Sequence, residues 1–187
     1  MRTANILCAI SLAITFSVVR PLDAEPSKET FGSNVIGEVY KHASGDDLWI
    51  YRFQPDHHDP SIDCCPAVVF FFGGGWNGGS VHQFEKHAAY LAQRGIVAFL
   101  ADYRVKNRQG TSPDACVRDG KSAIRWIRAN AARLGVDPER IGAGGGSAGG
   151  HVAAATGICN GFEDPADSNK ETSSKPNALL LFNPVYD

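Results

Sequence analysis

The stretch "GAGGGSAGGHVAA", residues 142–154, surrounds Ser147 with small residues and contains the pattern G-x-S-x-G. Small neighbours permit a sharp turn from a strand into a helix, because larger side chains would clash where the backbone bends. Such a turn raises the serine hydroxyl above the sheet edge, at a helix N-terminus whose dipole favours negative charge. The stretch predicts either a nucleophilic serine at a strand–helix junction or a serine that only caps the helix.

A second glycine-rich stretch, Phe72-Gly73-Gly74-Gly75-Trp76, follows a continuous apolar run at 67–72. The tetrahedral intermediate of acyl transfer needs backbone N–H groups directed at its oxyanion, and glycines let the main chain come that close. The order of the two glycine-rich stretches, each after a predicted strand, fits one site for acyl transfer.

The rest of the chain predicts an α/β fold with a mostly parallel sheet and helices on both faces. Runs at 67–72, 96–101 and 178–183 are continuously apolar, as expected of parallel strands covered on both sides. The first two strands have the character of an antiparallel edge pair. The predicted strands are residues 34–40, 48–53, 67–72, 96–101, 140–143 and 178–183.

Three helices are predicted between these strands. The first begins with a capping box formed by Ser80 and Gln83 and ends at Gly95. The second covers 113–134 as one amphipathic helix, and the third begins at the glycine-rich stretch and reaches residue 155. The polar segment 159–177 is interpreted as a surface loop. The face of the second helix opposite its apolar stripe carries Lys121, Arg125, Arg128 and Arg133.

Residues 1–24 have the pattern of a secretory signal peptide, with an apolar run at 6–19 and a small-residue cleavage site. That run is shorter than the about 20 residues that span a bilayer, so we expect no membrane span and a secreted or periplasmic protein. The remaining domain is 25–187. The formal net charge of −2 argues against a nucleic-acid-binding surface.

Neither metal nor cofactor is expected. No set of Cys and His residues has C-x-x-C or H-E-x-x-H spacing, and adjacent cysteines are a poor zinc pair. Export would allow disulfides, and the pairing stays open among Cys64, Cys65, Cys116 and Cys159.

One competing interpretation is a dinucleotide site. Gly73, Gly75 and Gly78 also spell G-x-G-x-x-G after a strand, and Asp102 ends the next strand where a ribose-binding acid would stand. Against it, the next helix begins only at Ser80, and the pattern around Ser147 is left unexplained.

The segments "FFGGGWNGG", "ADYRV", "ACVRDGKSAIRWIRANAARLGVDPERI" and "GGSAGGHVAA" together resemble the α/β-hydrolase superfamily. The similarity is to its esterase/lipase branch with an HGGG-type loop, especially to acetyl-xylan-esterase-like secreted carboxylesterases, and covers residues 39–187. It implies that Ser147 is the nucleophile and that the N–H groups of Gly74, Gly75 and Ala148 form the oxyanion hole, with Gly73 as an alternative donor.

Two further features follow from the resemblance. Phe72 stands where the loop of the family normally opens with a His that organises the loop and is not the catalytic base. Tyr103 and Asp119 resemble positions of the family whose role is structural, so we do not count them as catalytic.

The other members of a catalytic triad are not evident. In this fold the order is Ser, then an acid, then His, but the one histidine after Ser147 is His151, for which we expect a packing role. Asp187 follows the strand at 178–183, one strand too early for the acid. We therefore expect an N-terminal portion of a longer enzyme, with acid and base beyond Asp187, inactive by itself. The histidines before Ser147 are interpreted as loop and helix-surface residues: His42, His57, His58, His82 and His87.

The leading hypothesis is a serine hydrolase that cleaves carboxylic esters through an acyl-enzyme on Ser147. Its substrate would be a small-molecule or carbohydrate ester with a short acyl group, an expectation that rests on the resemblance. Two alternatives stay open: a non-catalytic binding domain with this fold, and a dinucleotide-dependent oxidoreductase.

Overall fold

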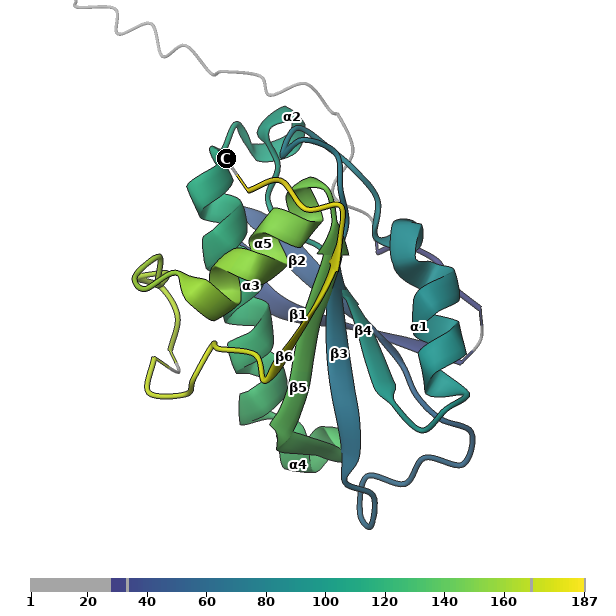
Figure 1. The fold of residues 1–187 in the computed structure, drawn as a ribbon. Coiled ribbons are helices and arrows are strands. Elements are labelled where there is room, and N and C mark those ends of the chain that lie inside the picture. Colours follow the sequence, from purple (N-terminus) through teal and green to yellow (C-terminus); the bar gives the residue numbers. More distant parts are fainter. Residues whose placement is uncertain (1–27, 33, 169, 187) are drawn as a thin grey trace, which may run out of the picture.

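The computed structural model describes residues 28–32, 34–168 and 170–186. The predicted signal peptide at 1–24 and Asp187 lie outside these residues. Within them the chain forms a six-stranded sheet in the order β1-β2-β4-β3-β5-β6 (Figure 1). Among the described residues, no helix has the length and apolar character needed to span a membrane.

The sheet confirms the predicted mostly parallel α/β fold. β3, β4, β5 and β6 run parallel, whereas β1 pairs antiparallel with β2, and β2 antiparallel with β4. β3 and β4 are central and almost wholly buried, as their continuous apolar sequences predict. The same expectation is wrong for 178–183, because β6 is the edge strand of the described sheet and its residues are exposed or half-buried. The strands are β1 (Val35–Ala43), β2 (Asp46–Phe53), β3 (Cys65–Phe71), β4 (Val97–Ala101), β5 (Val136–Gly146) and β6 (Ala178–Phe182).

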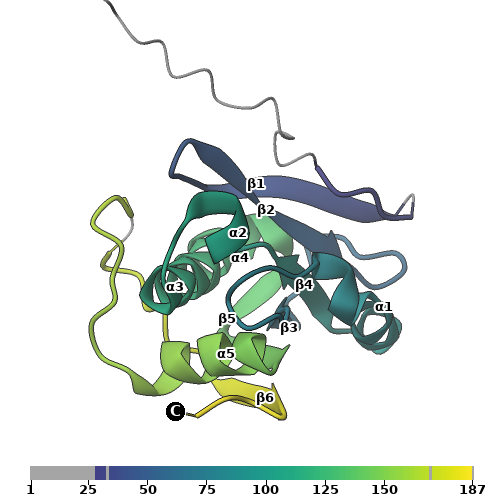
Figure 2. The same cartoon turned by 90° about the horizontal axis from the view of Figure 1, so that it is seen from above.

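The helices cover both faces of the sheet. Figure 2 shows α1 on one face and α3 with α5 on the other. The helical elements are the 3-10 helix η1 (Val81–Phe84) and the α-helices α1 (Glu85–Ala92), α2 (Lys106–Gln109), α3 (Pro113–Ala129), α4 (Ala131–Leu134) and α5 (Ala148–Ile158).

The prediction of one continuous helix over 113–134 is wrong. The helix breaks at Asn130, where φ is −102° and ψ is 10°. The side-chain amide of Asn130 donates to the carbonyl of Trp126 at 2.8 Å. An asparagine that bonds to the nearby backbone competes with the helical pattern, so α3 ends here and α4 follows as a separate four-residue helix.

The polar face predicted for the second helix is not exposed at Lys121 and Arg125. Both side chains are buried under the segment 159–177. Lys121 pairs with Glu163 at 3.0 Å, and Arg125 with Asp167 at 2.6 Å. The segment has no helix or strand in its described part, as predicted, but its carboxylates bind this face of α3.

Candidate active site

Ser147 is the single residue between β5 and α5, as the G-x-S-x-G pattern predicts. Its φ of 51° and ψ of −119° are strained for a residue with a side chain. Its N–H donates to the carbonyl of Phe182 at 3.0 Å, and its carbonyl accepts from the N–H of His151 at 3.0 Å. The ends of β6 and α5 thus hold Ser147 in this conformation from both sides.

The side chain of Ser147 is exposed and makes no capping hydrogen bond to α5. The interpretation of Ser147 as a helix cap is therefore wrong. A strained, exposed serine at a helix N-terminus is the arrangement that the nucleophile interpretation expects.

The close approach of α5 to β3 requires Gly149. A Cβ atom there would lie 2.1 Å from the carbonyl oxygen of Phe71 and 2.3 Å from that of Phe72. A real Cβ cannot occupy that position, so a side chain at 149 would push α5, and Ser147 with it, away from the sheet.

The glycine loop after β3 passes directly over Ser147. A Cβ atom on Gly73 would lie 2.7 Å from the carbonyl oxygen of Gly146 and 3.3 Å from the Cβ of Ser147. Among the described residues, no acceptor takes the N–H groups of Gly74, Gly75 and Ala148. These are the three donors predicted for the oxyanion hole, and that role stays a prediction.

Gly73, the alternative donor, is already engaged. Its N–H donates to the side-chain oxygen of Gln83 at 2.6 Å. The predicted capping box is wrong in this respect, because Gln83 reaches the glycine loop instead of the N–H of Ser80. Ser80 does cap η1, accepting from the N–H of His82 at 3.2 Å. A glutamine three residues after a predicted helix start can accept from the N–H of the capping residue or from another nearby N–H. The sequence alone therefore does not distinguish Ser80 from Gly73 as the partner of Gln83.

Phe72 is buried and stacks on Tyr103, with ring centroids 4.2 Å apart and planes at 16°. The hydroxyl of Tyr103 donates to the carbonyl of Phe72 at 2.5 Å. Burial raises the pKa of the Tyr103 phenol far above its ordinary value, so it stays protonated and remains a donor. Ring stacking and the Gln83 contact thus fix the loop at the position where the resemblance expects a His.

His151 lies one turn into α5, and its ring meets that of Trp76 edge-on at 5.3 Å. The Nδ1 of His151 and the Nε1 of Trp76 are both buried without a hydrogen-bond partner among the described residues. Burial lowers the pKa of His151 below its ordinary value. Within the described part of the chain, no hydrogen bond or ion pair joins its ring to Ser147 Oγ or to a carboxylate, which agrees with the expected packing role.

Asp102, the ribose-binding acid of the dinucleotide interpretation, is engaged within the protein. Arg108 binds its two carboxylate oxygens at 2.8 and 2.6 Å, and the N–H of Tyr103 donates to it at 2.8 Å. The carboxylate is therefore committed to the end of β4, and this geometry does not support a nucleotide site.

His58 is the exception among the histidines expected on loop and helix surfaces. Its side chain is fully buried, and its Nδ1 lies 3.1 Å from Asp63 Oδ2. The interpretation as a surface residue is wrong for His58, because the loop at 54–64 folds back over the start of β3. This cluster lies away from Ser147, at the opposite end of the strand.

The family model described as BD-FAE matches residues 54–183. The chain belongs to this α/β-hydrolase esterase family. Its curated relatives include "Carboxylesterase NlhH" of Mycobacterium tuberculosis, 37% identical over 93 residues, which cover 49% of this chain and 28% of that protein. "Probable carboxylic ester hydrolase LipM" of the same organism is 28% identical over 152 residues, covering 79% of this chain and 33% of that protein.

Solved structures of esterase 2 from Thermogutta terrifontis are also similar. The apo form is 46% identical, with a TM-score of 0.79, covering 89% of this chain and 59% of that one. The form phosphorylated by paraoxon is 48% identical, with a TM-score of 0.79, covering 82% and 58%. The chain thus spans about a third or less of these two curated relatives and somewhat more than half of these solved chains.

Proposed function

We propose that Ser147 is the nucleophile of a carboxylesterase. The observation that carries the proposal is the strained conformation of Ser147, held between β5 and α5 directly beneath the Gly73–Gly75 loop. Strain at an exposed polar residue persists only where the surrounding structure maintains it, and such residues cluster at active sites. Membership in an esterase family supports the same role.

In the proposed reaction the Ser147 oxygen bonds to the ester carbonyl carbon while the N–H groups of Gly74, Gly75 and Ala148 bind the oxyanion. The C–O bond then breaks, the alcohol leaves with a proton, and an acyl-serine remains. Water attacks that ester, which releases the carboxylic acid and restores the hydroxyl. A serine needs a base for this at neutral pH, and the order of the fold puts acid and base after Ser147.

We further propose short acyl esters as the substrates, with acyl groups on carbohydrate as one class. Propionate-bound and butyrate-bound structures of Thermogutta terrifontis esterase 2 support the short acyl chain. The carbohydrate part rests on the resemblance to acetyl-xylan-esterase-like enzymes. Secretion or export to the periplasm, from the pattern of residues 1–24, belongs to the same proposal.

The test is hydrolysis of 4-nitrophenyl acetate, butyrate and octanoate by the protein and by Ser147→Ala, together with fluorophosphonate labelling. The matched control is Ser173→Ala, which changes an exposed serine of the 159–177 segment. We expect Ser147→Ala to lower kcat by a factor of about 10⁴ or more and to abolish labelling, while the control keeps both. Equal activity in a folded Ser147→Ala protein would refute the proposal. The assays use the complete protein, including any acid and base that follow Asp187. A complete protein that folds but is unlabelled and inactive would favour the binding-domain alternative.

A further inference from the structure

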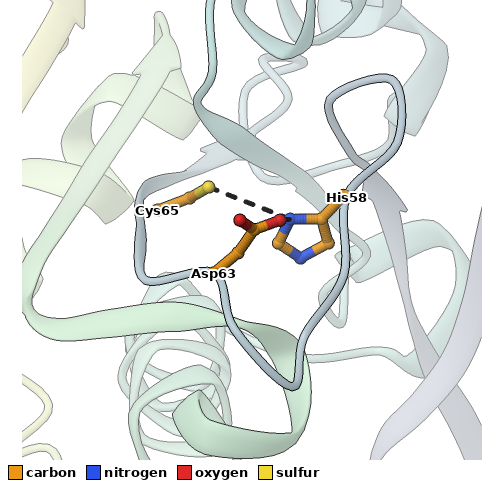
Figure 3. Close-up of side chains that lie close together, drawn as sticks. All are labelled: His58, Asp63 and Cys65. Atoms are coloured by element: carbon orange, nitrogen blue, oxygen red, sulfur yellow. Dashed lines mark hydrogen bonds and ion pairs between the residues drawn. The ribbon is translucent and has the colours of Figure 1, made fainter.

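The loop between β2 and β3 brings His58, Asp63 and Cys65 together at the N-terminal end of β3 (Figure 3). One ligand-type atom from each residue lies within 4.8 Å of the others. This is the end of the sheet opposite Ser147, because β3 leads from Cys65 toward the glycine loop. Neither the family match nor the proposed hydrolysis gives the cluster a role.

The orientation of the His58 ring is fixed by the backbone. Its Nε2 lies 2.9 Å from the carbonyl oxygen of Leu134, which can only accept a hydrogen bond. Nε2 therefore carries a proton, and in the neutral form of the ring Nδ1 presents a lone pair. A Cβ on Gly135 would lie 2.7 Å from the ring, so the ring fits here only because residue 135 is glycine.

That lone pair faces two further electron-rich groups. Nδ1 lies 3.1 Å from Asp63 Oδ2 and 3.8 Å from Cys65 Sγ. A lone pair beside a carboxylate oxygen is repulsive unless a proton or a metal cation lies between them. Histidine ligands of metals commonly show this same arrangement, with the second ring nitrogen donating to a carbonyl or carboxylate.

The two separations from His58 Nδ1 are close to the edges of a tetrahedral zinc site. Zinc bonds of about 2.0 Å to nitrogen and oxygen and about 2.3 Å to sulfur separate N from S by about 3.6 Å and N from O by about 3.3 Å. The two measured separations, 3.8 and 3.1 Å, each differ from these values by little. A set of imidazole, thiolate and carboxylate is one that zinc accepts, whereas magnesium and calcium prefer oxygen alone.

The loop is also held in place without a cation. Asp63 Oδ2 accepts from the N–H of Asp59 at 2.7 Å, and the N–H of Cys65 donates to the carbonyl of Gly135 at 2.9 Å. The neighbouring cation, Arg140, is paired with Asp137 at 2.6 Å. The ligand groups are therefore preorganised, and the positive charge near them is already balanced.

We propose that His58 Nδ1, Asp63 Oδ2 and Cys65 Sγ bind a zinc-class divalent cation, with water as the fourth ligand. The cation ties the loop at 54–64 to the start of β3 and, through His58 and Leu134, to the end of α4. Its role is structural. From the sequence we expect no metal because neither C-x-x-C nor H-E-x-x-H spacing is present. The spacing of His58, Asp63 and Cys65, H-x₄-D-x-C, differs from both of these motifs.

The test uses purified protein, stripped of metal with a chelator and kept reduced. It is titrated with Co²⁺, which gives a thiolate charge-transfer band and strong d–d bands in a tetrahedral site, and then with competing Zn²⁺. We expect one equivalent to bind and zinc to raise the melting temperature. Because ester hydrolysis is not the readout, failure here is distinguishable from failure of the proposed nucleophile.

Three variants identify the ligands. Cys65→Ser should abolish the charge-transfer band, and Asp63→Asn should weaken binding by more than the about 10- to 100-fold that loss of an outer partner costs. Cys64→Ser, which changes the exposed neighbouring thiol, should keep the band and is the matched control. The proposal is overturned if no band forms, or if Cys64→Ser loses it as Cys65→Ser does while Asp63→Asn binds normally, because adjacent thiols alone would then hold the metal.

Discussion

Replacing Ser147 by glycine should stabilise the protein. At a φ of 51° and a ψ of −119°, any residue with a Cβ is strained, whereas glycine adopts this conformation without steric cost. The hydroxyl makes no capping hydrogen bond to α5, so its removal costs little. Ser147→Ala keeps the strain and removes the same hydroxyl, which makes it the reference for the glycine variant.

The size of the effect follows from two opposing contributions. Relief of strain at such a residue is worth about 1–3 kcal/mol. The greater freedom of glycine in the unfolded chain offsets about 0.4–1 kcal/mol of that. We expect Ser147→Gly to exceed Ser147→Ala by about 0.5–2 kcal/mol in free energy of unfolding, and by about 1–8 °C in melting temperature for a domain of this size.

The measurement is urea denaturation of the two variants, supported by thermal melts. The control is Ser112→Gly, since Ser112 also precedes a helix without capping it but has an ordinary φ of −91°. Glycine there should be neutral or slightly destabilising. If Ser147→Gly unfolds at the same urea concentration as Ser147→Ala, or below it, the conformation is not strained and the main support for the nucleophile is lost.

Three other outcomes follow from the structure. Gly149→Ala should lower the free energy of unfolding in urea by about 3 kcal/mol or more, because the added Cβ would overlap backbone atoms that must then move. The control Gly32→Ala, whose Cβ would meet nothing, should cost under about 1 kcal/mol. Equal costs for the two variants would contradict the close approach of α5 to β3. Tyr103→Phe should cost about 1–3 kcal/mol because the carbonyl of Phe72 loses its donor, and a neutral result would refute that bond. Burial raises the pKa of Asp164, but its hydrogen bond from a lysine outweighs this, and the folded-state pKa lies below the ordinary value. The ionised Asp164 carboxylate therefore stabilises the folded protein above its unfolded-state pKa, and this stabilisation is lost as pH falls through the folded-state pKa. In urea unfolding at decreasing pH, the free energy of unfolding of the parent protein should fall more than that of Asp164→Asn.

The sequence predicts the sheet well because the signal is local. The apolar runs that become β3, β4 and β6 need no knowledge of their partners to be recognised as strands. The turn at Ser147 is equally local, since the small residues around it allow only a few backbone paths.

The unpredicted burial of Lys121, Arg125 and His58 results from contacts between distant parts of the chain. The periodicity of α3 correctly identifies a polar face, but Lys121 and Arg125 are covered by carboxylates about forty residues later. The burial of His58 depends on the carbonyl of Leu134, 76 residues away. No pattern within one helix or loop contains such a partner.

The segment "ADYR" after β4 illustrates how structural residues support the candidate site. Asp102 is held by Arg108, and Arg104 by the buried Asp119, whose oxygens accept from its Nε at 2.8 Å and its Nη2 at 2.7 Å. Tyr103 lies between these two anchored residues, and its ring and hydroxyl both contact Phe72.

Phe72 in turn leads directly into the glycine loop over Ser147. The polar anchors at the end of β4 therefore fix the height of the loop above the serine without contacting a substrate. An oxyanion hole made of backbone N–H groups depends on such support, because its donors have no side chains with which to position themselves.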